Sequence, residues 1–97
     1  MTITFIMTVE FPSWPPVDYQ APSEWITFRK TNYIDTGKIL SVNVIEDSKT
    51  KTKIYTTIFA DESSLQEWKN ESIVISHTQS RNSFYEDNNI FKIVQEL

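Results

Sequence analysis

The chain has 97 residues, of which 39% are hydrophobic and 13% aromatic, with a formal net charge of −4 and no cysteine. This length predicts a single domain, residues 1–97, with one core. The lack of cysteine excludes disulfides, thiolate nucleophiles and cysteine-ligated metal sites. The acidic balance argues against a nucleic-acid partner, and no apolar run approaches the length that spans a bilayer. We therefore expect a soluble, cytoplasmic protein.

Residues 2–11 alternate strictly between apolar and polar side chains and predict a half-buried strand. Phe5, Met7 and Val9 share its inward face. Residues 12–22 contain all four prolines of the chain, which predicts an extended surface connection. Its aromatic side chains either cover an edge of the core or dock a partner, and we favour the first interpretation.

A helix is predicted next, because Ser23 is positioned to cap a helix that runs from Glu24 to about Tyr33. Trp25 and Phe28 would share one face of it. Aromatic and β-branched residues are poor helix formers, however, so an extended segment is the alternative.

The central stretch begins after Gly37, whose freedom in φ suits a helix stop or tight turn. Residues 38–46 and 54–60 read as strands joined by a short polar turn, which predicts an antiparallel hairpin. Residues 54–60 are apolar on both faces, as expected of a strand in the middle of a sheet. Alternation in the earlier strand places one set of side chains together (Leu40, Val42 and Val44) and the other set opposite them (Ile39, Ser41, Asn43 and Ile45).

A second helical region follows the hairpin, with Asp61 as its expected cap. Leu65 and Trp68 are three residues apart and should face the sheet. Helical spacing resumes through His77 after a break near Asn70. The neighbouring acidic residue at position 62 makes an acid/base pair with Asp61 conceivable, but a capping role explains both carboxylates better.

Residues 90–97 alternate again and supply the last strand, so the order is βαββαβ. That order predicts a ferredoxin-like α+β fold, in which two helices cover one face of a four-stranded antiparallel sheet. The opposite face is mixed in character and is predicted to be the interface of a homodimer. Its predicted residues are Thr4, Ile6, Thr8, Ile39, Ser41, Asn43 and Ile45.

The stretch from Gly37 through the hairpin into residues 54–62 and 65–68 resembles the antibiotic-biosynthesis-monooxygenase-type family. The resemblance implies a dimeric α+β barrel, in which two such sheets pack face to face. It covers residues 37–78 best and the first strand loosely. Because it rests on a pattern of residue types, it speaks to fold more than to chemistry.

Heme-degrading members of that family place a tryptophan beneath the heme and an iron-ligating histidine about ten residues later. Trp68 and His77, nine positions apart, are similar to this pair. Those members also carry an asparagine on the first strand, and the first strand here has none.

His77 is the sole histidine, so a multi-histidine metal site is excluded and no metal is expected. The predicted ligand-pocket residues are Trp25, Phe28, Tyr33, Trp68 and His77, and no catalytic residue is assigned. The sequence thus favours a homodimeric, non-catalytic binding or assembly module without a cofactor. Its partner would be an unknown protein or a small apolar ligand. The alternative is a cofactor-independent or heme-using monooxygenase with a pocket between helices and sheet, and only this alternative would involve heme.

Overall fold

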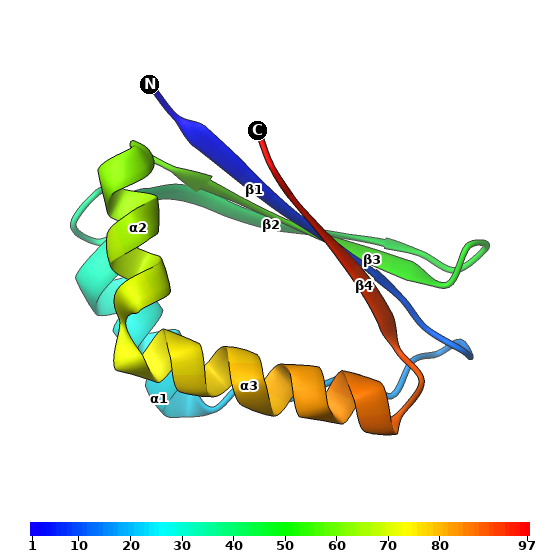
Figure 1. Ribbon diagram of the computed structural model, residues 1–97. Coiled ribbons are helices and arrows are strands. Elements are labelled where there is room, and N and C mark those ends of the chain that lie inside the picture. Colours follow the sequence, from blue (N-terminus) through cyan, green and yellow to red (C-terminus); the bar gives the residue numbers. More distant parts are fainter.

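A computed structural model describes residues 1–97 and shows a four-stranded antiparallel sheet with helices on one face (Figure 1). The elements are β1 (Ile3–Glu10), α1 (Ser23–Arg29), the π-helical turn η1 (Lys30–Ile34), β2 (Ile39–Asp47), β3 (Thr52–Phe59), α2 (Glu62–Asn70), α3 (Ser72–Asp87) and β4 (Phe91–Glu96). The strand order is β2-β3-β1-β4, and both termini lie at the same end of the sheet. The predicted ferredoxin-like α+β class is confirmed, with the central position of β3.

The second helical region is broken, as predicted, and forms two helices that meet at a corner (Figure 1). Asp61 caps α2 by accepting a 2.7 Å hydrogen bond from the backbone N–H of Ser64. Between the helices, Glu71 is extended, with φ −69° and ψ 127°. Its carboxylate accepts a 2.9 Å hydrogen bond from the Tyr33 hydroxyl, which ties the corner to η1.

The first helix forms, but Ser23 does not cap it. The N-cap is Pro22, which has no side-chain donor or acceptor, and Ser23 is already helical. The carbonyl of Pro22 accepts from the N–H of Trp25 at 3.1 Å instead. The chain then widens into η1, where the N–H of Asp35 donates to the carbonyl of Lys30, five residues back, at 2.8 Å.

A β-bulge near the start of β2 corrects one predicted residue of the outer face. Ile39 pairs with Phe59, yet the next pairing joins Ser41 to Ile58, so Leu40 is the extra residue. The extra residue reverses the alternation, and Ile39 points toward the helices with only 1% of its surface exposed. The prediction that Ile39 belongs to the dimer face was therefore wrong.

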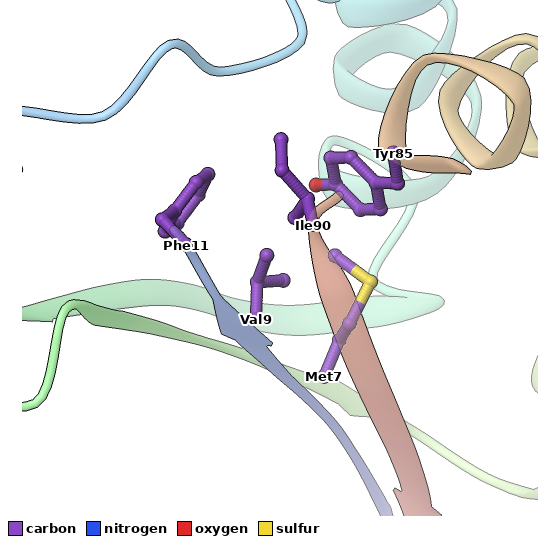
Figure 2. Close-up of a cluster of buried hydrophobic side chains, with 5 residues drawn as sticks. All are labelled: Met7, Val9, Phe11, Tyr85 and Ile90. Carbon is purple, nitrogen blue, oxygen red and sulfur yellow. The ribbon is translucent and has the colours of Figure 1, made fainter. Parts of the chain in front are cut away.

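The helix-covered face of the sheet holds two packed clusters. The Tyr85 cluster comprises Met7, Val9, Phe11, Tyr85 and Ile90, and Figure 2 shows the strand side chains directed toward the tyrosine at the end of α3. The Leu65 cluster comprises Tyr33, Ile39, Phe59 and Leu65. Phe59 pairs with Ile3 at one end of β1, so the two clusters lie toward opposite ends of the sheet. Trp14 and Tyr19 pack on the Tyr85 cluster, which confirms that the proline-rich segment covers a core edge.

No helix covers the opposite face of the sheet (Figure 1). Strand register places the other predicted dimer-face residues there: Thr4, Ile6, Thr8, Ser41, Asn43 and Ile45. Ile54 and Ile58 of β3 pair with residues of this set and lie on the same face. On β4, Ile93 pairs with Thr8 and is 52% exposed. The outer face is thus a surface of isoleucine and threonine around the middle of the sheet.

Candidate ligand-binding site

A cavity of about 280 Å³ lies between the sheet and the helices, in the middle of the face whose two ends are filled by the clusters. Phe5 and Met7 of β1 and Tyr55 and Thr57 of β3 contribute its sheet side. The helices α1 and α3 contribute the opposite side. This volume lies just below the usual range of small-molecule sites, about 300–1,000 Å³.

The cavity opens between α1 and the edge strand β2. Three of its lining residues are substantially exposed: Ile26 at 46%, Val42 at 37% and Val44 at 46%. Lining residues that also face solvent mark a mouth, and these three belong to α1 and β2. A ligand would enter past aliphatic side chains, which favours an apolar body.

The inner wall of the cavity is aromatic. The rings of Trp25 and His77 stack with their centroids 4.0 Å apart and only 13° between their planes. Trp68 meets Trp25 edge-on at 5.9 Å, and Tyr19 meets His77 edge-on at 5.5 Å. Three of the predicted pocket residues, Trp25, Trp68 and His77, are therefore brought together at the cavity.

The other two predicted pocket residues, Phe28 and Tyr33, do not line this cavity. Tyr33 is 1% exposed and belongs to the Leu65 cluster, against which Phe28 packs. Tyr33 leaves the expected helical face because η1 changes the helical spacing and turns this side chain into the core. Phe28 packs beside it, with the two ring centroids 5.8 Å apart.

Arg29 and Arg81, which the sequence reading missed, both line the cavity. They are the only arginines of the chain. Neither forms an ion pair, whereas four lysines pair with carboxylates at 2.8–3.3 Å. The guanidinium carbon of Arg29 instead lies 4.7 Å from the centroid of the Trp25 ring. Burial lowers the pKa of both arginines, although a guanidinium stays charged at any physiological pH.

Every buried side-chain nitrogen or oxygen that lacks a hydrogen-bond partner belongs to a residue of this cavity. These atoms are Trp25 Nε1, Arg29 Nε, His77 Nδ1 and Arg81 Nε. Such atoms are uncommon in folded proteins, and each one costs free energy unless a partner satisfies it. Their concentration in one place marks the cavity as a binding site.

The imidazole of His77 is neutral at physiological pH. The residue is 8% exposed, and burial is the main cause that lowers its pKa to about 4, followed by the positive charges of Arg81 and Arg29. A neutral imidazole can accept a proton or donate a hydrogen bond.

A polar network supports the cavity from the sheet side. The Tyr55 hydroxyl donates a 2.8 Å hydrogen bond to Asp18, and Lys53 Nζ lies 2.9 Å from the same carboxylate oxygen. Burial and then the bond to Asp18 raise the pKa of Tyr55. Because Asp18 belongs to the proline-rich segment, this network holds that segment beside β3.

The sequence did contain a signal for the missed arginines. Arg29 follows Trp25 by four residues, and Arg81 follows His77 by four, so each continues a helical face already predicted to point inward. Charged residues on such a face normally lie at its edge, so Arg29 and Arg81 were not predicted to line a pocket. Tyr55 was predicted only as part of the central strand 54–60, which is apolar on both faces.

Comparison with known proteins places the fold. No protein-family model and no curated sequence matches the chain. Among solved structures, a point variant of SnoaB, a cofactor-independent oxygenase from Streptomyces nogalater, is similar with a TM-score of 0.63 and 8% identity, over 99% of this chain and 90% of that one. Unaltered SnoaB is similar with a TM-score of 0.61 and 9% identity, again over 99% of this chain and 90% of that one. A candidate antibiotic biosynthesis monooxygenase from Deinococcus radiodurans gives 0.55 and 9%, over 100% of this chain and 90% of that one.

The chain has the fold of the antibiotic-biosynthesis-monooxygenase type. The predicted resemblance is thereby confirmed at the level of fold. Identities of 8–9% carry no residue-level correspondence, so the chemistry has to be argued from the cavity of this monooxygenase-type fold itself.

The residues present do not fit a heme. Phe5 and Met7 occupy the inward face of β1 and already line a cavity of about 280 Å³, small for a tetrapyrrole. The His77 ring is stacked on Trp25 at 4.0 Å, and its Nδ1 is buried. A macrocycle would have to displace these side chains before iron could reach the imidazole.

No helix of the structure has the combined length and hydropathy that a bilayer crossing requires.

Proposed function

We propose that this protein is a cofactor-independent oxygenase of a small aromatic molecule bound in the cavity. The observation that carries the proposal is a neutral imidazole, stacked among aromatic rings in the cavity and flanked by two guanidinium groups. SnoaB, which has the same fold, is described as a cofactor-independent oxygenase, and that description supports the proposal.

An oxygenase without a cofactor must draw electrons from its substrate. A CH₂ group that is acidic because its carbanion is conjugated with a ketone and an aromatic ring can supply them once it is deprotonated. The balanced reaction is R₂CH₂ + O₂ → R₂C=O + H₂O, in which one oxygen atom enters the product and the other leaves as water. His77 would accept the proton, and the positive charges of Arg29 and Arg81 would stabilise the enolate.

The same pair of arginines lowers the pKa of His77, yet a bound enolate reverses this effect. The negative charge offsets the two positive charges, so the imidazole becomes more basic as the substrate anion forms. His77 also borders a second groove, between α1 and α3, that includes Ser76 and Ser80. The proton accepted in the cavity would leave to solvent through this groove.

The test is oxygen uptake with a bicyclic enolisable ketone, 2-tetralone, measured with an oxygen electrode and by mass analysis of the product. The wild type should accelerate uptake, and His77→Gln should lower the rate by about 100-fold or more, as expected for loss of a general base. Gln79→Ala, on an exposed position of α3, is the matched control and should retain the wild-type rate. Binding of the ketone without oxygen uptake would favour the second candidate, a non-catalytic binding module.

We also infer that the protein is a homodimer through its outer sheet face. Five isoleucines on that face have no helix to cover them: Ile6, Ile45, Ile54, Ile58 and Ile93. Burial of such a surface against a second copy would remove apolar area from water. Light scattering of the wild type should give twice the chain mass of 11.4 kDa, and the Ile93→Glu variant should give the mass of a single chain. A wild-type monomer would contradict the inference.

A further inference from the structure

One enolate oxygen does not account for two arginines in one cavity, neither of which has a counter-ion in the protein itself. We propose that the ligand is a flat aromatic carboxylate, whose ring system lies in the aromatic part of the cavity and whose carboxylate is bound by Arg29 and Arg81. This inference deepens the proposed function by naming the substrate class, but the binding that it predicts does not depend on turnover.

The first argument is charge. The chain has 13 acidic residues against 9 lysines and arginines, so carboxylates are plentiful, and yet none lies within 4.0 Å of either guanidinium. A half-buried guanidinium has lost part of its hydration, and a charged or polar acceptor offsets that loss best. Because the protein supplies no such carboxylate, an anionic ligand is the partner that fits.

The second argument is hydrogen-bond capacity. Trp25 Nε1, Arg29 Nε and Arg81 Nε are obligatory donors, and all three are buried without an acceptor. A carboxylate is purely an acceptor with about four lone-pair positions, and it matches the planar fork of a guanidinium. A neutral ketone offers one oxygen and would leave most of these donors unsatisfied.

The third argument is shape. Ile26, Val42 and Val44 at the mouth are aliphatic, and the inner wall is formed by Trp25, His77 and Trp68. A ligand of this site therefore needs a flat apolar body, and a cavity of about 280 Å³ suits two fused rings better than four. Free inorganic anions would satisfy the arginines and leave the aromatic surfaces uncovered.

The fourth argument concerns the groups that face His77. Arg29 faces it from α1, Arg81 from its own helix, and Tyr19 from the proline-rich segment. Among these three side chains, both charged groups are positive, so an anion between the arginines changes the local charge sharply. The titration of His77 therefore reports on an anion in the cavity.

The experiment compares two probes of equal shape, naphthalene-2-carboxylate and its neutral amide, 2-naphthamide, by calorimetry and by quenching of tryptophan fluorescence. The carboxylate should bind at least about tenfold more tightly than the amide, as expected for a charge-assisted bidentate contact. Arg81→Met should weaken carboxylate binding by about tenfold or more and change amide binding by less than about twofold. Lys38→Met, which removes a lysine already paired with Glu67 at 2.8 Å, is the control and should change neither.

A spectroscopic readout makes the test independent of affinity. His77 is the sole histidine, so its ring protons give one titration curve by NMR. Saturating carboxylate should raise the pKa of His77, and saturating amide should leave it unchanged. Arg81→Gln provides a second variant if the methionine side chain prevents folding.

Equal affinities for carboxylate and amide would overturn the inference. So would an equal loss of both ligands in Arg81→Met, because the arginine would then serve only to shape the cavity. Oxygen uptake from 2-tetralone without any preference for carboxylates would remove this inference and leave the proposed function intact. A carboxylate preference without oxygen uptake from 2-tetralone would remove the proposed function and leave this inference intact.

Discussion

The two ends of the helix-covered sheet face are packed, whereas its middle is hollow. At the ends, side chains such as Val9 and Leu65 have no exposed surface, and each cluster is almost purely apolar. In the middle, large aromatic rings share the space with two guanidinium groups and an imidazole. The ends therefore stabilise the fold, while the middle carries polar atoms that the fold itself does not satisfy.

The lysines and arginines repeat this contrast. Lys53 is paired with Asp18 at 2.9 Å although their side chains are only 16% and 11% exposed, so a buried charge next to the cavity is fully matched. Arg29 and Arg81 have no such match. Buried polar atoms without a partner are confined to this one site, which indicates that the site is shaped for something other than stability.

The largest expected effect is on the packed ends. Leu65→Ala removes a side chain that is 0% exposed, and it should lower the free energy of unfolding by about 3 kcal/mol through lost burial and a new void. Urea unfolding monitored by circular dichroism measures it. A loss below about 1 kcal/mol would mean that the Leu65 cluster is as loosely packed as the cavity.

The next effect is a pH dependence that originates in the cavity. The native pKa of His77 is about 4, below the unfolded value of 6.5, so the unfolded state binds a proton first as the pH falls. Stability should therefore decrease between about pH 6.5 and pH 4, by at most about 3 kcal/mol, and should not change through this group above pH 7.

His77→Gln removes this group and should flatten that part of the profile, as measured by urea unfolding at pH 7.0 and pH 4.5. Carboxylates titrate in both proteins and cancel in the comparison. Profiles that remain parallel would show that the imidazole is protonated as easily in the fold as in the unfolded chain.

A smaller effect compares the paired cation with the unpaired one. Lys53→Met leaves the Asp18 carboxylate without its ammonium partner and should cost about 2 kcal/mol. Arg81→Met removes a half-buried charge that has no partner and should stabilise the protein by about 1 kcal/mol. Thermal and urea unfolding of both variants measure these two changes in stability. Destabilisation by Arg81→Met equal to that of Lys53→Met would erase the distinction between the two regions.

The smallest expected effect is on hemin. Because Phe5 and Met7 fill the inward face of β1, hemin should bind weakly and without defined stoichiometry, and His77→Ala should leave its absorption spectrum unchanged. Absorbance titration checks this. A sharp Soret band at one equivalent, lost in the variant, would show that the cavity opens far more than its volume of about 280 Å³ suggests.

The sequence alone was sufficient for the elements whose pattern is local. Alternation along residues 2–11 predicted β1 and its inward residues, and Asp61 predicted the start of α2. The βαββαβ order then restricted the topology to the observed sheet. These predictions succeeded because a period of two, a capping carboxylate and the order of elements depend on neighbouring residues only.

Tertiary structure decided what a fixed period cannot encode. The bulge at Leu40 moved Ile39 from the outer face to the core, because one extra residue reverses the alternation of a strand. The wider turn of η1 moved Tyr33 out of the expected pocket, because it rotates the side chains that follow around the helix axis. Only folding brings Arg29 and Arg81 to one cavity from helices 52 positions apart along the chain. Whether a charged side chain is paired depends on such long-range neighbours. The sequence therefore shows the two arginines but does not show that they lack a partner.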